Sequence, residues 1–161
     1  MFDTETLELA TAVLAACRAK SWRVATAESC TGGLVAAALT AIPGSSDVVD
    51  RGFVTYSNAS KTQLLGVPEA TLAEFGAVSA ETVLAMAKGA IARAGVDLAL
   101  SVTGIGGPGG ASADKPVGLV YLGIATKSDA FAERHVFPGD RDTVRRAATI
   151  RALELLLREA R

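Results

Sequence analysis

Short stretches rich in β-branched and apolar residues alternate along this chain with longer stretches of helical periodicity. The short stretches predict five strands, at residues 22–27, 48–56, 97–102, 117–126 and 130–137. The longer stretches predict helices at residues 4–20, 34–42, 59–65, 79–94 and 140–160, with a short helix or turn at 68–75. Only Lys127–Asp129 separates the last two strands, so these are expected to form an antiparallel hairpin.

This order of elements predicts an α/β protein. Strands and helices alternate early and a hairpin closes the sheet, which favours a single three-layer α/β/α domain with a mixed β-sheet covered on both faces. The length of 161 residues fits one compact domain, and no internal repeat or linker divides residues 1–161. Thr4 and Ser79 are the expected N-terminal caps of two of the helices.

Charge and cysteine content argue against several classes of protein. The net charge of −1 creates no field that attracts nucleic acid or anionic membrane. No apolar run approaches the roughly 18 residues of a membrane span, and acidic residues interrupt the apolar N-terminus, so we expect neither a membrane segment nor a signal peptide. Cys17 and Cys30 are too few for a disulfide scaffold and lack zinc-type spacing, so we expect a cytoplasmic protein without a metal.

The turn Glu28–Gly33 joins a predicted strand to a predicted helix. Ser29 would project from the carboxyl end of the strand, near helix-start N–H groups that favour a developing negative charge. Gly32 and Gly33 would let a substrate approach the backbone closely. Two alternatives stay open: Ser29 or Thr31 caps the helix, or Cys30 is the nucleophile because a helix N-terminus lowers the pKa of a thiol.

A nucleophilic serine needs a base, and Lys61 is the candidate. The one histidine, His135, lies in the predicted hairpin, and no sequence feature brings it to Ser29. Lys61 follows Tyr56 at the start of a predicted helix, and Ser-Lys pairs are a known alternative to Ser-His. Such a lysine must be neutral, and Tyr56 would hydrogen-bond Ser29 or Lys61 or carry a proton. The alternative is an exposed lysine and a half-buried tyrosine.

Two further segments are candidates for binding a substrate. Five glycines occupy the eight residues from Thr103 to Gly110, a composition that lets a loop present N–H groups to a phosphate but also suits a plain flexible loop. The segment has neither a Walker ending nor a following helix. Arg141 and Arg145 lie four residues apart on one helix face, where they would grip a phosphate or pair with Asp142 or Glu133.

Together these stretches closely resemble the C-terminal domain of the CinA family, the nicotinamide-nucleotide amidases. The resemblance covers nearly the whole chain in order. Its matching stretches are 27–33 (AESCTGG), 56–61 (YSNASK), 76–79 (GAVS), 103–108 (TGIGGP), 115–118 (KPVG) and 137–141 (FPGDR).

The resemblance implies deamidation of nicotinamide mononucleotide to nicotinate mononucleotide and ammonia, without a cofactor. It implies acylation of Ser29, proton transfer to Lys61 and assistance from Tyr56. It also implies that the turn at residues 28–33 and the glycine loop line the nucleotide site, with an arginine near the phosphate. The implied binding residues are Thr31, Gly32, Gly33, Thr103, Gly104, Gly106, Gly107, Arg141 and Arg145.

Two interpretations other than an enzyme remain open. A non-catalytic pyridine-nucleotide-binding module would keep the glycine loop and the arginines, but it has no need of Ser29 and Lys61 together. An interaction domain would use its Ala-rich helices as an oligomer interface. The second interpretation is compatible with catalysis, and we expect a homo-oligomer.

Overall fold

The computed structural model describes residues 1–161. It contains five strands: β1 (Val24–Glu28), β2 (Val49–Val54), β3 (Leu98–Gly104), β4 (Leu119–Thr126) and β5 (Ala130–Val136). It contains six α-helices: α1 (Thr4–Ala19), α2 (Leu34–Thr40), α3 (Asn58–Leu65), α4 (Glu69–Phe75), α5 (Ala80–Ala94) and α6 (Arg141–Ala160). A short 3-10 helix at Ser45–Asp47, which the sequence pattern did not predict, precedes β2.

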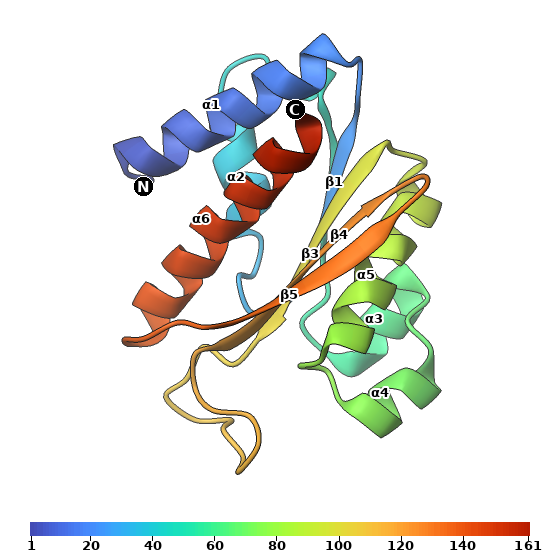
Figure 1. Ribbon diagram of the computed structural model, residues 1–161, viewed down its shortest axis with the longest axis vertical. Helices are drawn as coiled ribbons and strands as arrows, with labels where there is room; N and C mark the ends of the chain where they lie inside the picture. The colour runs from blue at the N-terminus through green and yellow to red at the C-terminus, as the bar shows by residue number, and fades with distance from the viewer.

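The strands form one mixed sheet in the order β2-β1-β3-β4-β5. β1 is parallel to both β2 and β3, and β4 is antiparallel to β3 and to β5. Helices α1, α2 and α6 cover one face, and α3, α4 and α5 cover the other (Figure 1). The predicted three-layer α/β/α fold and the β4–β5 hairpin are therefore confirmed.

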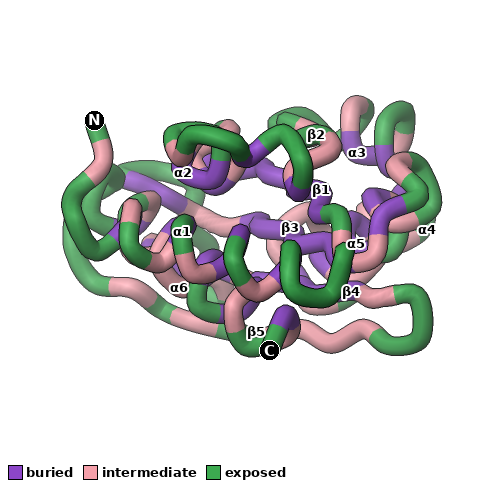
Figure 2. Tube along the Cα trace, turned by 90° about the horizontal axis from the view of Figure 1, so that it is seen from above, coloured by how far each residue is buried: buried purple, intermediate pink, exposed green.

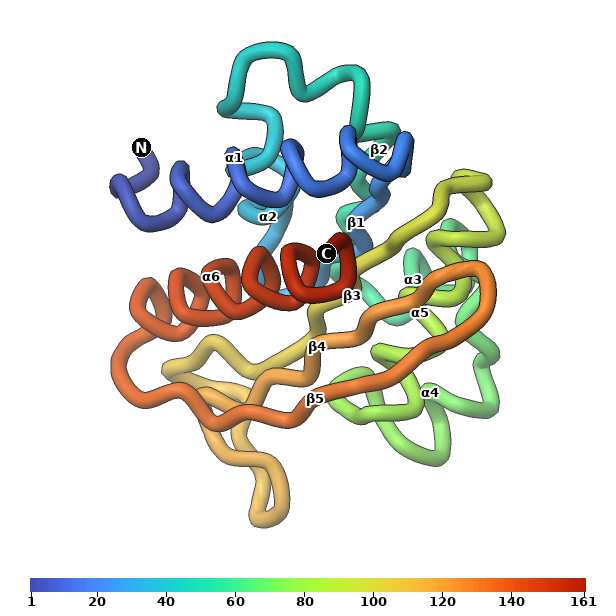
Figure 3. Tube along the Cα trace, turned by 45° about the horizontal axis from the view of Figure 1, so that its top comes forward, coloured from blue at the N-terminus to red at the C-terminus, as the bar shows by residue number.

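The sheet is buried most deeply at its centre. All five residues of β1 and the first six of β3 are buried, because helices cover both faces of these strands (Figure 2). The larger apolar cluster lies between the sheet and α1, α2 and α6, where α1 and α6 run side by side (Figure 3). A smaller cluster packs β1 and β3 against α5 and the end of α3. Burial on both faces suits the apolar residues that make up most of these strands, although Thr26, Glu28 and Ser101 are buried there as well.

Local side chains cap four of the helices. Ser79 caps α5 as predicted, since its Oγ accepts a hydrogen bond from Thr82 N at 3.1 Å. The predicted cap Thr4 is wrong by one residue, because Asp3 Oδ1 accepts from Thr6 N at 2.9 Å and Thr4 is already helical. A carboxylate at this position also interacts favourably with the helix dipole. The other two side-chain caps are Ser57 on α3 and Asp140 on α6.

Gly89 marks the closest approach between α5 and α3. A Cβ added at Gly89 would lie 2.0 Å from the carbonyl oxygen of Leu65. We expect Gly89→Ala to lower the free energy of unfolding by about 2 kcal/mol, despite alanine's better helix propensity, because the helices must separate. Gly109→Ala is the control, since nothing lies within 4 Å of its added Cβ. Urea unfolding measures both, and equal stabilities would contradict this packing.

Candidate active site

The carboxyl ends of three neighbouring strands meet at one edge of the sheet. Glu28 at the end of β1 is paired with Val54 of β2 and with Val102 of β3. The residues that follow these positions therefore emerge together, as is usual for ligand sites in α/β proteins. The long loop between β3 and β4 projects beyond the sheet at this edge (Figures 1 and 3).

Ser29 and Lys61 are brought together here. Lys61 Nζ lies 3.0 Å from Ser29 Oγ and donates a second hydrogen bond to the carbonyl oxygen of Thr55 at 2.8 Å. Lys61 is only 1% exposed although it lies in a polar helix. Ser57 caps α3 and so fixes the residue at which the helix begins. With this start, the Lys61 side chain points inward, toward Ser29.

The environment of Lys61 favours its neutral form. Burial lowers the pKa of the Lys61 amine below its ordinary value of 10.5, because a charged amine loses its hydration there. No carboxylate accepts a hydrogen bond from its Nζ. A buried amine without an anionic partner, in contact with a hydroxyl, is the arrangement that a lysine base requires.

Ser29 and Lys61 open into a cleft of about 260 Å³. Backbone from the β3–β4 loop forms much of its wall. Of the residues predicted from the sequence, those that line it are Ser29, Tyr56, Lys61, Thr103, Gly104, Gly106, Gly107 and Arg141. The hydroxyl of Thr103 is already engaged within the protein, because it donates a hydrogen bond to Ala77 O at 2.8 Å.

Tyr56 lies in the lining of the cleft and does not contact Ser29 or Lys61 through a hydrogen bond. Its side chain is exposed, and its hydroxyl accepts a hydrogen bond from Arg141 Nη2 at 2.9 Å. Arg141 Nη1 also donates to the carbonyl oxygen of Gly107 at 2.9 Å, so one guanidinium joins the tyrosine to the glycine loop. The hydrogen bond predicted from Tyr56 to Ser29 or Lys61 is absent from the structure.

Gly106 and Gly107 pack closely against neighbouring side chains. A Cβ at Gly106 would lie 3.2 Å from Arg141 Nη1, so the missing side chain leaves space for the guanidinium. Gly107 has a φ of +80°, and a Cβ there would lie 2.6 Å from Val117. The loop is therefore built to pack against Arg141 and Val117.

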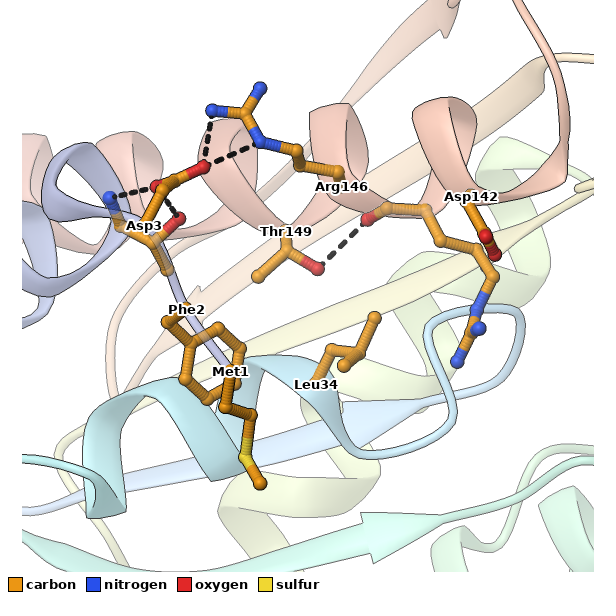
Figure 4. Close-up of a pocket in the computed structure, with 9 residues that line it drawn as sticks. Met1, Phe2, Asp3, Leu34, Asp142, Arg146 and Thr149 are labelled. Atoms are coloured by element: carbon orange, nitrogen blue, oxygen red, sulfur yellow. Dashed lines mark hydrogen bonds and ion pairs between the residues drawn. The ribbon is translucent and has the colours of Figure 1, made fainter.

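Arg145 lies on the other side of the turn that follows β1. Its Nε donates to Cys30 O at 3.1 Å and its Nη2 to Thr31 O at 3.2 Å. It borders a second cavity, of about 320 Å³, near Phe2, Leu34 and Arg146 (Figure 4). No residue lines both this cavity and the cleft that contains Ser29 and Lys61.

Neither arginine has the surface partners considered in the sequence analysis. No hydrogen bond or ion pair joins Arg141 or Arg145 to Asp142 or Glu133. Glu133 is occupied by His135, Arg151 and Arg158. His135 thus pairs with Glu133, and it does not line the cleft.

Glu28 is the residue whose role the sequence reasoning missed. It is fully buried, and its carboxylate accepts from Thr31 Oγ1 at 2.7 Å and from three backbone N–H groups. Those groups are Gly33 N at 3.1 Å, Val35 N at 3.1 Å and Ala36 N at 2.9 Å. The helix-start N–H groups expected to favour negative charge at Ser29 are therefore occupied. Thr31, Gly32 and Gly33 also lie outside the cleft lining.

Cys30 is poorly suited to act as the nucleophile. Burial raises the pKa of its thiol to about 11, and the nearby carboxylate of Glu28 adds to the effect. A thiol with this pKa carries almost no thiolate at neutral pH. The helix N-terminus was expected to lower the pKa of the Cys30 thiol, but burial raises it instead. Cys17 and Cys30 are both free cysteines.

No group of three or more His, Cys, Asp or Glu side chains is arranged to hold a metal ion. No helix combines the length and apolar character needed to cross a membrane.

The fold and the site define a class: a three-layer α/β protein with a serine beside a buried lysine at the carboxyl edge of its parallel strands. The family model described as the CinA C-terminal domain matches residues 6–160. This chain therefore belongs to the CinA C-terminal domain family.

Similar proteins cover almost all of the chain. It is 53% identical to the nicotinamide-nucleotide amidohydrolase PncC of Enterobacter agglomerans, over 94% of this chain and 93% of that protein. It is 50% identical to the protein of that name from Escherichia coli K12, over 97% and 95% of the two chains. The crystal structure of the competence/damage inducible protein CihA from Agrobacterium tumefaciens superposes with a TM-score of 0.96 at 47% identity, covering 98% and 97%.

Proposed function

We propose that this protein is an amidohydrolase that converts nicotinamide mononucleotide to nicotinate mononucleotide and ammonia. Its relatives of nearly equal length are named nicotinamide-nucleotide amidohydrolases. The observation that carries the mechanism is the 3.0 Å contact between Lys61 Nζ and Ser29 Oγ in a cleft. We propose Ser29 as the nucleophile and Lys61 as the base, with no cofactor.

The first half of the reaction acylates Ser29. Neutral Lys61 takes the hydroxyl proton as Ser29 Oγ bonds to the carboxamide carbon. The positively charged pyridinium ring draws electron density from this carbon and favours the attack. The Lys61 ammonium then gives its proton to the amide nitrogen, the C–N bond breaks, and ammonia leaves.

The second half returns the enzyme to its starting state. A water molecule gives a proton to Lys61 and its oxygen bonds to the acyl carbon. The bond from that carbon to Ser29 Oγ breaks, and Oγ takes the proton back from Lys61. One lysine thus serves as base and acid in both halves, and no histidine is needed.

Cys30 N–H is the donor we propose for the developing oxyanion. Ser29 N already donates to Val102 O at 2.9 Å, and Gly32 N donates to Ser29 O at 3.0 Å. Cys30 N–H donates to no other residue of the protein, and Cys30 lines the cleft next to Ser29. The residue after the serine supplies such a donor in other hydrolases with a strand–turn–helix nucleophile.

We propose that Arg141 binds the substrate phosphate. It is the one arginine that lines the cleft. Arg141→Met is expected to raise the KM for nicotinamide mononucleotide roughly 10- to 100-fold, the loss typical of one charge-assisted contact. Arg146→Met is the matched control, because Arg146 pairs with Asp3 and Glu5 away from the cleft.

Steady-state kinetics with nicotinamide riboside, which lacks the phosphate, complete this test. Arg141→Met is expected to leave the KM for the riboside nearly unchanged. An equal loss with both substrates would show that Arg141 acts by holding Tyr56 and the glycine loop, and the phosphate assignment would be wrong.

The function itself is tested by incubating the purified protein with nicotinamide mononucleotide and measuring ammonia and nicotinate mononucleotide together. Equal amounts of the two products are expected. Thermal stabilisation by the nucleotide without any ammonia would instead favour the non-catalytic binding module.

The remaining expectations stay predictions. We propose that residues 1–161 form one domain, that the protein is cytoplasmic, and that it is a homo-oligomer. Light scattering of the purified chain tests the oligomer directly, and a monomeric mass at micromolar concentration would contradict it.

A further inference from the structure

The start of α2 differs from those of the four helices that have a local side-chain cap. Asp3, Ser57, Ser79 and Asp140 each accept one hydrogen bond from the backbone N–H three residues later. At α2 the N-cap is Gly33, in a left-handed conformation and without a side-chain cap. The helix start is held instead by the carboxylate of Glu28, from the preceding strand.

Holding the start of α2 with a buried carboxylate costs more free energy of desolvation than a local side-chain cap does. A carboxylate that is fully buried loses its hydration, and no lysine or arginine pairs with Glu28. A serine or threonine next to the helix would cap it without that loss, as Ser57 and Ser79 do in this chain. The location explains the difference, because Ser29 lies between Glu28 and the helix that Glu28 holds.

The carboxylate accounts for much of the shape of the Ser29 turn. On one side, Glu28 binds the N–H groups of Gly33, Val35 and Ala36 and the hydroxyl of Thr31. On the other side, Arg145 binds the carbonyl oxygens of Cys30 and Thr31. Hydrogen bonds thus hold both the N–H groups and the carbonyl groups of the turn, while Cys30 N–H donates to no other residue.

We propose that Glu28 is a positioning residue for the serine nucleophile. By tying the end of β1 to the start of α2, its carboxylate keeps Ser29 Oγ within hydrogen-bond distance of Lys61 Nζ and keeps Cys30 N–H directed at the substrate oxygen. Glu28 itself does not line the cleft. The inference rests on the proposed role of Ser29 as nucleophile.

Three substitutions separate positioning from simple stabilisation. Glu28→Gln keeps the size but directs an amide NH2 at groups that are themselves donors. Thr31→Val removes only the hydroxyl that donates to Glu28, and Thr31→Ser restores it. Each variant is studied well below its own Tm, so that only folded protein contributes.

The first readout is the rate at which an alkyl fluorophosphonate labels Ser29, followed by intact mass. In this reaction Ser29 Oγ bonds to phosphorus, fluoride leaves, and the hydroxyl proton passes to Lys61. We expect labelling about 100-fold slower in Glu28→Gln and about 10-fold slower in Thr31→Val, because small displacements of a reacting group are costly. Thr31→Ser is expected to stay within about threefold of the wild type.

The second readout is the split between kcat and KM for nicotinamide mononucleotide. The losses are expected in kcat, with KM nearly unchanged, because Glu28 does not touch the cleft. A Glu28→Gln protein with a lower Tm but wild-type labelling would overturn the inference and leave a structural role. If Glu28→Gln does not fold, the labelling rates of Thr31→Val and Thr31→Ser are compared instead. Equal rates in these two variants would overturn the inference.

The labelling rates also keep this inference separate from the proposed function. Wild-type labelling at Ser29 without ammonia release would contradict the amidase while the variants still report on Glu28. Wild-type labelling no faster than in Ser29→Ala would overturn the inference, because there would be no activated serine to position.

Discussion

Ser29→Ala is expected to lower kcat for ammonia release by about 10⁴-fold or more, the loss seen when a catalytic serine is removed from other hydrolases. The reason is that no second nucleophile is available in the cleft. The Cys30 thiol has its pKa raised to about 11 by burial, and so it does not substitute for the serine. The KM or Kd for the nucleotide should change little, because the glycine loop and Arg141 remain in place.

Cys30→Ala provides the comparison for this prediction. It removes the rival nucleophile but keeps the backbone N–H of residue 30, so a loss of less than about fivefold is expected. Initial rates of ammonia release measure both variants. Normal activity in Ser29→Ala, together with its loss in Cys30→Ala, would transfer the role of nucleophile to the cysteine.

Lys61→Met is expected to abolish turnover and at the same time to make the protein more stable. Methionine fills a similar volume without placing an amine in a site that is 1% exposed. Replacing a buried ionisable side chain by an apolar one of similar volume is often stabilising, and we expect about 1–2 kcal/mol after the lost bond to Thr55 O is counted. This corresponds to a Tm higher by about 3–6 °C.

The stability difference should depend on pH with a defined sign. Burial holds the pKa of Lys61 in the folded state below its ordinary value of 10.5, so the unfolded chain binds a proton more readily. The cost of burying Lys61 is therefore fully present at pH values below its folded pKa and disappears as the pH rises toward 10.5. Thermal unfolding of Lys61→Met and wild type should differ most at low pH and converge at high pH.

The same lowered pKa predicts how activity depends on pH. Only neutral Lys61 accepts the serine proton, so kcat/KM should rise with pH along a limb centred below 10.5. Lys88→Met is the control, because Lys88 is an exposed residue on α5. It should leave both the activity and the pH dependence of Tm unchanged. A Lys61→Met variant that kept turnover, or lost stability at every pH, would contradict the assignment of the base.

The architecture was largely predictable because its signals are local. Five strands and the principal helices follow from periodicity, and the three residues between β4 and β5 leave room only for a hairpin. Boundaries were less certain by a residue or two, as the cap of α1 shows: Asp3 and Thr4 are both good caps, and the start of the helix decides between them.

The sequence also determined which residues lie at the ligand edge. Ser29 and Tyr56 follow β1 and β2, Thr103 lies near the end of β3, and parallel strands bring their carboxyl ends together. Their placement in one cleft therefore needs only the correct sheet.

Burial and direction were decided by the tertiary structure alone. Lys61 lies in a polar helix, whose sequence is typical of an exposed surface. It is buried because α3 packs over the edge of the sheet where Ser29 emerges. Arg141 and Arg145 share one helix face, yet Arg145 binds the carbonyl oxygens of the turn after β1 and only Arg141 lines the cleft. Glu28 finds its donors only once α2 has formed beside β1. Spacing in the sequence shows which residues are close along the chain. The pKa and the contacts of a side chain depend instead on the elements that pack around it and exclude water.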